Sequence, residues 1–425
     1  MAFLTNRRRG ALALAGLAAV VTLAACGEDD IDVTSPPDLE AQLFQRYVAL
    51  GNSITAGYQS GGLNDSLQNR SYARVLATEI FKTSYQVNLL RKPGCPAPTT
   101  SFGGARLGGA TAPPCSLITT TTPRFVNNVA VPGALVVDAT NNFTSSSNTL
   151  TVLLSGGLSQ VTRTLAADPT FVSVWLGNND VLLASTVGLP TATASVPNVP
   201  GVASPGVTTV EAFRTRYGLM IDSLRLARSL RGGVLLGVVD VTNIPYFITG
   251  ASLDDPTNRA LFNAAAGRTV TIHASCTGNT NALIGIGILS LLRANAALPV
   301  VCQKIPASSG TGTDPVVGEV FILDQAERTT VQATVTGYNA YIKAKADSLG
   351  WAYVDPNELL IAERTAGRIT TFPNFAAPAG GNFFGADISF DAVHPSTRAH
   401  RAIANAVARA VSAKYSIPLD TVTVP

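Results

Sequence analysis

The sequence has 425 residues, which is enough for one large domain or for two or three domains of ordinary size. Hydrophobic residues make up 46% of the chain and charged residues 13%, so the composition excludes disorder driven by charge and low hydrophobicity. The 30 basic and 27 acidic residues give a formal charge of +3, and the arginines at positions 7–9 account for this excess. Because no other basic run occurs and aromatic residues are few, the sequence lacks the basic surface of a nucleic-acid-binding protein.

The N-terminus has the pattern of an export signal. Arg7 to Arg9 precede a 14-residue apolar stretch, Gly10 to Leu23, which is followed by two alanines and Cys26. This stretch is shorter than the roughly 20 residues that span a bilayer, which disfavours a transmembrane anchor. The arginines also permit a twin-arginine signal. The whole pattern resembles a bacterial lipoprotein signal, which implies that residues 1–25 are removed and that Cys26 carries the lipid.

Residues 26–43 are expected to form a linker, because acidic residues and a Pro-Pro pair dominate their first part and little apolar pattern is present. The protein is therefore expected in the bacterial cell envelope, either lipid-anchored at a membrane, with the outer membrane favoured, or secreted. It is also expected to be a monomer.

Four further cysteines occur at positions 95, 115, 276 and 302. An even number of cysteines in an exported protein favours disulfides. Each neighbouring pair brackets an irregular stretch, which predicts the local pairs Cys95–Cys115 and Cys276–Cys302, with free buried thiols as the alternative. The sequence has three histidines and neither a C-x-x-C nor an H-E-x-x-H spacing, so it predicts no metal site.

Short apolar runs that end at glycine or polar residues alternate with stretches of helical periodicity. Strands are predicted at 47–50, 85–90, 128–131, 171–176, 234–239 and 351–354. Helices are predicted over 72–80, from a capping box at 208–211 to Gly232, over 331–349, and from Pro395 to 411.

This alternation favours a parallel sheet with helices on both faces, in one domain over residues 44–415. The stretches 92–124, 184–207 and 248–317 interrupt it and are predicted to be insertions, and residues 416–425 form a C-terminal tail. Within the last insertion, residues 282–292 are apolar except at Ser290. They are expected either to pack as a helix on the main domain or to form a hydrophobic cap beside the catalytic edge.

Two segments near the ends of the domain carry candidate catalytic residues. Ser53 follows the first predicted strand, where the N–H groups of a helix start can stabilise an anion, although serine is also a common helix N-cap there. Asp391 lies three residues before His394, a spacing that lets the carboxylate reach Nδ1 and leaves Nε2 free as a base. His273 and His400 lack such a partner and are expected in solvated or core positions.

Two loops between these segments supply candidate donors for an oxyanion. Gly133 follows one predicted strand, and Asn179 lies in the sequence Gly-Asn-Asn-Asp after another. With the N–H of Ser53 they would form an oxyanion hole of three donors. The four segments, in this order, resemble the blocks of the SGNH hydrolase superfamily, the GDSL-type esterases and lipases, and in particular its secreted bacterial lipoproteins.

The resemblance implies a flavodoxin-like three-layer α/β/α sandwich and assigns five roles. Ser53 is the nucleophile, His394 the base and Asp391 the acid that orients it, while Ser53, Gly133 and Asn179 are the oxyanion donors. Neither a metal nor an organic cofactor is implied.

One residue departs from the family pattern, since Asn52 stands where the family has aspartate. That aspartate is not the orienting acid, so the change is expected to alter local hydrogen bonding and the pH profile rather than the reaction. Asp180 and Asp387 are rival orienting acids on composition alone, but neither has the three-residue spacing to His394.

These features predict a serine esterase that hydrolyses carboxylic esters through an acyl-enzyme. The substrate is expected to be a lipid or fatty-acyl ester, or an O-acetyl group on a saccharide. The alternative is a catalytically idle envelope lipoprotein that keeps the fold to bind carbohydrate or another cell-surface ligand.

Overall fold

A computed structural model describes residues 39–109, 114–119, 125–141, 149–188, 192–193, 206–295, 298–303 and 321–425. The predicted signal segment, Cys26 and part of each predicted insertion lie outside these residues. Helix α1 (Leu39–Phe44) includes the last five residues of the stretch 26–43 that was predicted as a linker. Among the described residues, no helix combines the length and apolarity needed to cross a bilayer.

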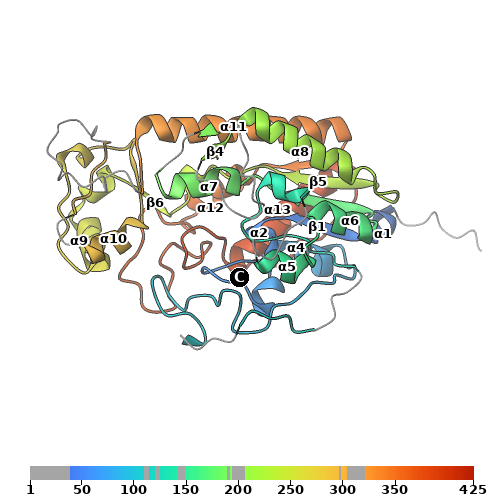
Figure 1. The fold of residues 1–425 in the computed structure, drawn as a ribbon, viewed down its shortest axis with the longest axis horizontal. Coiled ribbons are helices and arrows are strands. Elements are labelled where there is room, and N and C mark those ends of the chain that lie inside the picture. The colour runs from blue at the N-terminus through green and yellow to red at the C-terminus, as the bar shows by residue number, and fades with distance from the viewer. Residues whose placement is uncertain are drawn as a thin grey trace, which may run out of the picture. The chain divides into compact units, whose positions relative to one another are not determined.

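The centre of the fold is a sheet of four parallel strands (Figure 1). Its order is β1 (Tyr47–Gly51), β2 (Phe171–Trp175), β5 (Gly232–Leu236) and β9 (Ala352–Val354). Every residue of the first three strands is buried, as expected of strands covered on both faces. The predicted parallel α/β architecture is confirmed.

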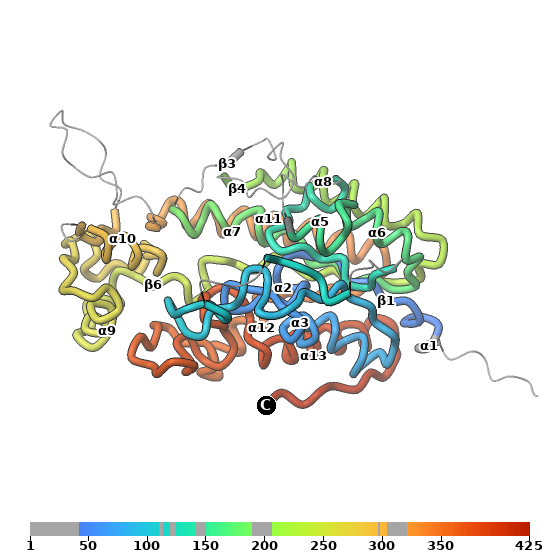
Figure 2. The backbone as a smooth tube through the Cα atoms, turned by 60° about the horizontal axis from the view of Figure 1, so that its bottom comes forward, coloured from blue at the N-terminus to red at the C-terminus, as the bar shows by residue number. Residues whose placement is uncertain are grey.

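The two faces of the sheet carry two apolar cores, because side chains alternate along each strand. Val48 and Leu50 of β1 face a core shared with four helices, whereas Tyr47 and Ala49 face a second core. Helices α6 (Gln160–Ala167), α7 (Asn179–Thr186), α8 (Val210–Leu224) and α11 (Gln325–Leu349) cover the first face. Helices α1, α4 (Tyr72–Val75) and α13 (Thr397–Tyr415) cover the other, so the fold has three layers (Figure 2).

Two of the predicted strands are not strands. Residues 85–90 form only an isolated antiparallel bridge, between Leu90 and Leu117. Two of their N–H groups donate to side chains instead of to a strand: Gln86 N to Asn127 Oδ1 and Leu90 N to Gln68 Oε1. Residues 128–131 lie parallel to β1 but form only an isolated bridge, between Asn128 and Ala49.

Several helix boundaries differ from the prediction because the capping residues were misassigned. Thr209, not Thr208, caps α8, and α8 ends at Leu224 rather than near Gly232. Helix α11 begins at Gln325, behind a capping box formed by Asp324 and Glu327. The predicted helix over 72–80 is α4 followed by a π-helical turn, η1 (Leu76–Ile80), and α13 begins at Thr397 after its cap Ser396.

Shorter elements complete the described chain. They are α2 (Ser53–Ala56), α3 (Asp65–Gln68), η3 (Val136–Ala139), α5 (Thr149–Ser155), β3 (Ala192–Thr193), β4 (Val207–Thr208), η4 (Val241–Asn243), η5 (Ala251–Leu253), η6 (Ala274–Cys276) and α12 (Pro356–Thr365).

The predicted insertion at 248–317 is more than a loop, because its described part builds a small subdomain. Strands β6 (Phe247–Thr249), β7 (Leu283–Gly285) and β8 (Ile322–Leu323) form an antiparallel sheet. Helices α9 (Pro256–Ala266) and α10 (Ile288–Ala294) share a separate apolar core with this sheet, at the left of Figure 1.

The apolar stretch at 282–292 belongs to this core. Leu289 is 2% exposed and Leu292 is fully buried, which favours the packed alternative over a cap that offers these side chains to lipid. Their core also contains Phe383, Phe384 and Ala392 from the segment before His394, so the stretch packs against the main domain as well as inside the insertion. The structure contains both predicted disulfides, Cys95–Cys115 and Cys276–Cys302.

Candidate active site

Ser53 lies in a tight turn between β1 and α2. Gly51 ends the strand, and a Cβ atom at this position would lie 2.1 Å from Thr55 Oγ1, so the turn requires glycine. Asn52 caps the helix, because its Oδ1 accepts a hydrogen bond from Ile54 N at 3.1 Å. Asn52 thus holds the turn in place of the family's aspartate, while its Nδ2 is buried without a partner among the described residues.

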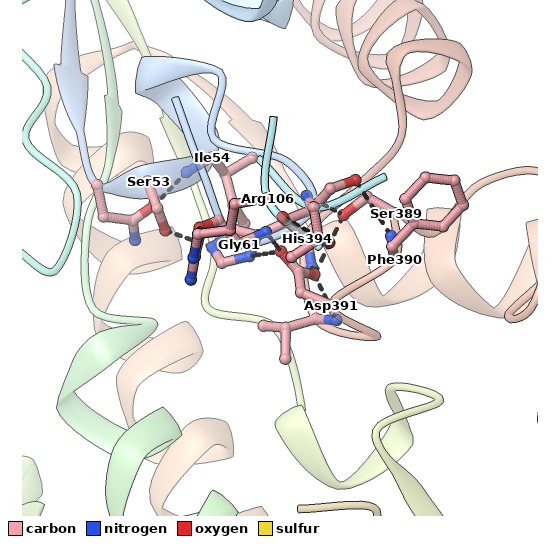
Figure 3. A network of polar contacts seen from close by, with 12 residues as sticks. Ser53, Ile54, Gly61, Arg106, Ser389, Phe390, Asp391 and His394 are labelled. Carbon is pink, nitrogen blue, oxygen red and sulfur yellow. Dashed lines mark hydrogen bonds and ion pairs between the residues drawn. The ribbon is translucent and has the colours of Figure 1, made fainter. Parts of the chain in front are cut away.

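His394 connects Ser53 to Asp391 (Figure 3). The distance from His394 Nε2 to Ser53 Oγ is 2.8 Å, and the distance from Nδ1 to Asp391 Oδ2 is 2.9 Å. Ser53 and His394 lie 341 positions apart in the sequence. The turn after β1 and the loop before α13 therefore meet at the carboxyl edge of the sheet, and one imidazole ring is hydrogen-bonded to both neighbours.

Five donors hold the Asp391 carboxylate. Oδ1 accepts hydrogen bonds from Ser389 Oγ, Val393 N and His394 N, while Oδ2 accepts them from Gly61 N and His394 Nδ1. Burial raises the pKa of Asp391, but the charge and hydrogen bonds of His394 and the N–H of Gly61 outweigh it and lower the pKa to about 2. Asp391 is therefore ionised at neutral pH and favours a proton on Nδ1 of His394.

Residues that the sequence did not single out support this carboxylate. Ser60 N donates to Ser389 Oγ at 2.9 Å, and Arg106 Nη1 donates to Gly61 O at 2.8 Å. Arg106 belongs to the stretch predicted as an insertion at 92–124, and Figure 3 shows it beside Gly61 and His394. Arg106 and Gly61 lie 45 positions apart in the sequence, and Ser60 and Ser389 lie 329 positions apart. No local sequence pattern could therefore predict these contacts.

The Tyr58 ring packs on the imidazole of His394, with the ring centroids 4.8 Å apart. Burial and the nearby charge of Asp391 raise the pKa of Tyr58 to about 12. The phenol is therefore neutral at physiological pH and adds no second negative charge beside His394.

The two predicted oxyanion loops also meet. Asn179 is the first residue of α7, and its Nδ2 donates to Ala134 O at 2.9 Å, next to Gly133. Gly133 has a φ of 82°, in the region that favours glycine. The same loop is tied to the nucleophile turn, because Val131 N donates to Gly51 O at 3.1 Å. In the described chain, the N–H groups of Ser53 and Gly133 have no acceptor, which leaves them available to a ligand.

Asp180 does not contact His394. It is fully buried and accepts hydrogen bonds from Val136 N and Thr208 Oγ1, both at 3.0 Å. Burial raises the pKa of Asp180 to about 7. Its contacts link the Gly133 loop to the start of α7, so it supports the candidate oxyanion donors instead of the histidine.

Asp387 and the other two histidines also lie apart from the Ser53–His394 contact. Asp387 pairs with Arg398, and burial together with Glu363 raises the pKa of Asp387 to about 6. His400 is buried, its Nδ1 accepts a hydrogen bond from Tyr72 N, and burial lowers its pKa to about 3. His273 is exposed and bonds to Ser275.

An apolar cavity is lined by residues that flank Ser53 and His394 in the sequence, whereas Ser53 and His394 themselves do not line it. Its walls include Ile54, which follows Ser53, and Val393 and Pro395, which flank His394. Trp175 at the end of β2 and Ala402 of α13 also line it. Its volume is about 80 Å³, counted as the space open to the centre of a water molecule. Such a cavity holds roughly five to eight water-sized atoms, at about 10–15 Å³ each.

Comparison with known proteins gives a family and a small set of similar structures. A family model described as GDSL-like Lipase/Acylhydrolase matches residues 47–407. No curated protein matches the chain. The solved acetylxylan esterase from Geobacillus stearothermophilus is similar with 13% identity and a TM-score of 0.35, over 86% of this chain and 94% of that one. An extracellular lipase from Streptomyces rimosus shares 15% identity over 83% of this chain and 94% of that one, with a TM-score of 0.28.

Proposed function

We propose that this chain, which belongs to the GDSL-like lipase/acylhydrolase family and is an ester-bond hydrolase, works through Ser53, His394 and Asp391. The observation that carries the proposal is the unbroken hydrogen-bonded series from Ser53 Oγ through both ring nitrogens of His394 to Asp391. An idle binding protein would have no use for this series. The proposal therefore favours catalysis over carbohydrate or surface binding.

In the proposed reaction, Ser53 Oγ attacks the ester carbonyl carbon while His394 Nε2 takes its proton. The Asp391 carboxylate stabilises the imidazolium through Nδ1–H. The oxyanion accepts hydrogen bonds from the N–H groups of Ser53 and Gly133 and from the side chain of Asn179. His394 then protonates the leaving alcohol, and a water molecule activated by the same ring hydrolyses the acyl-enzyme.

The proposed substrate is an ester with a short or medium acyl chain. The apolar cavity beside Ile54 and Val393 has room for roughly five to eight non-hydrogen atoms. An acyl group of about four to eight carbons would fill it, whereas an acetyl group would leave most of the apolar wall uncovered. Each methylene that enters contributes about 0.8 kcal/mol of transfer free energy, which favours the longer chains within this range.

The proposal also includes the cellular location of the enzyme. Two disulfides support an oxidising compartment, and the N-terminal pattern favours export with a lipid on Cys26. We expect a monomer held at the bacterial envelope by this lipid, with lipid esters and acylated saccharides as the available ester classes.

The test combines active-site labelling with kinetics on p-nitrophenyl esters. Ser53→Ala and His394→Ala are expected to lower kcat at least about 10³-fold, and Ser53→Ala should abolish labelling by a fluorophosphonate. His273→Ala is the matched control, because His273 is exposed and bonds only to Ser275, and it should keep full activity. Persistent labelling of Ser53→Ala, or a fast His394→Ala enzyme, would disprove the assignment. A panel from acetate to palmitate should show maximal kcat/KM between about four and eight carbons.

A further inference from the structure

A second and larger cavity lies between the main domain and the insertion. Its volume is about 270 Å³ by the same measure, which is room for roughly twenty water-sized atoms. The segment after β5, the antiparallel sheet of the insertion, and helices α11 and α12 form its walls. Arg328 of α11 and Arg364 of α12 both line it.

The wall of this cavity carries two positive charges and no negative one. The other lining residues are neutral, among them Asn243, Ser252 and Asn258. Asp240 contacts the wall through Thr242 and Asn243 but is not part of it. In the described part of the chain, neither arginine forms an ion pair.

Each of the two guanidinium groups donates only some of its hydrogen bonds to the protein. Arg328 Nη1 donates to Thr280 O at 3.0 Å, and Arg364 Nη2 donates to Asn243 O. The Nε atom of each arginine is buried and has no hydrogen-bond partner among the residues that the structure describes. Burial also lowers the pKa of Arg364, as expected of a cation that lacks a counter-charge. The neutral groups of the wall do not balance the charge of these two partly buried cations, and some of the N–H groups of the cations remain without an acceptor within the described ranges.

We propose that this cavity binds an oxyanion, a carboxylate or phosphate group, between Arg328 and Arg364. Guanidinium groups match the planar, multidentate geometry of such anions, and a bound anion would give both partly buried cations the counter-charge that the described residues do not supply. The ligand is either a free small molecule or an acidic group of the ester substrate. Ile244 lines both this cavity and the apolar cavity that Ile54 and Val393 line, so the two cavities are neighbours.

The site is tested by binding, so the result does not depend on the proposed esterase function. Titration calorimetry with inorganic phosphate and with succinate, at low ionic strength, should give saturable binding to the full chain and to its Ser53→Ala variant. Arg328→Gln and Arg364→Gln should each weaken binding about tenfold or more. Arg293→Gln is the matched control, because Arg293 also donates to a backbone carbonyl of the insertion, Ala265 O, but does not line the cavity.

The arginines also tie elements together, so their glutamine variants can lose stability. Arg328→Lys and Arg364→Lys keep the charge and should retain weakened binding, and each variant's melting temperature is compared with and without phosphate. Absence of saturable binding to the unmodified chain, or equal affinity in the arginine variants and the Arg293→Gln control, would overturn the proposal.

A second measurement identifies the source of the anion. KM is compared for the p-nitrophenyl esters of valerate and hemiglutarate, which have acyl groups of equal length and differ in a free carboxylate. If the anion belongs to the substrate, the Arg328→Gln and Arg364→Gln variants should raise KM for hemiglutarate alone, and the site is then a substrate subsite. If KM is unchanged for both esters while phosphate binding is lost, the site holds a free ligand.

Discussion

Replacing Asp391 with asparagine keeps the shape of the side chain but reverses part of its hydrogen bonding. Oδ1 faces three donors and Oδ2 faces two, Gly61 N and His394 Nδ1. In Asp391→Asn, the amide oxygen is expected to occupy the position of Oδ1, where it accepts the same three hydrogen bonds. The NH₂ group then occupies the position of Oδ2 and faces the two donors there. His394 can then keep its contact only as the tautomer with Nδ1 unprotonated, and Nε2, now protonated, cannot take the proton of Ser53.

The expected loss in kcat is about 10³- to 10⁴-fold, with KM little changed, because the wrong tautomer affects the transition state. Stability should also fall. The pKa of Asp391 drops from 3.8 to about 2, which at about 1.4 kcal/mol for each pKa unit corresponds to roughly 2.5 kcal/mol in favour of the folded, ionised state. Because the folded pKa is depressed, this stabilisation is present above about pH 4 and is lost as the pH falls towards 2.

The assay is p-nitrophenyl butyrate hydrolysis with active-site titration, together with thermal melting at pH 7 and pH 3. Asp168→Asn is the matched control, because Asp168 pairs with Arg46 and accepts a hydrogen bond from Ser229 Oγ, but it neither contacts His394 nor lines the apolar cavity. It should lose a little stability but keep kcat. An Asp391→Asn enzyme with kcat within tenfold of the original, or an inactive Asp168→Asn enzyme that still folds, would refute the reasoning.

Three further substitutions test other parts of the molecule. Asn179→Ala removes a candidate oxyanion donor and should lower kcat about 10²-fold or more, and a change in KM alone would contradict that role. Leu289→Asp with Leu292→Asp places two charges in the core of the insertion, so melting temperature and the rates on acetate and long-chain esters should fall together. Selective loss of long-chain activity would instead revive a lipid-contacting cap. Cys26→Ser should lose diacylglyceryl labelling and leave the membrane fraction, and continued tight membrane association would contradict the lipid anchor.

The candidate catalytic residues could be predicted from the sequence because each lies in a short local pattern. The Asp391-to-His394 spacing fits one tight turn, and Ser53 follows a strand whose apolar residues are contiguous. The strand at 171–176 was equally clear, since β-branched and aromatic residues end at Gly177. In each case a few neighbouring residues determine the local conformation, so a single sequence is enough.

The failed predictions involve contacts between distant segments. Residues 85–90 were predicted as a strand, but they form only one bridge, to Leu117, and the side chains of Gln68 and Asn127 accept two of their N–H groups. The support of Asp391 by Gly61 and Arg106 likewise depends on chain segments that only the tertiary fold brings together. The capping error at Thr208 has the same origin, because the hydroxyl of Thr208 donates to the buried carboxyl of Asp180.

Contacts between distant segments also link the insertion to the loop that carries His394. Two short turns, after β1 and before α13, supply the proposed catalytic residues, and contacts of Gly61 and Ser60 help to hold the second turn. The insertion supplies no proposed catalytic residue, but it forms one wall of the cavity that Arg328 and Arg364 line, and its apolar core includes Ala392, two residues before His394. A change in the insertion can therefore alter what binds in that cavity, and a change in its core can also shift the loop that carries His394.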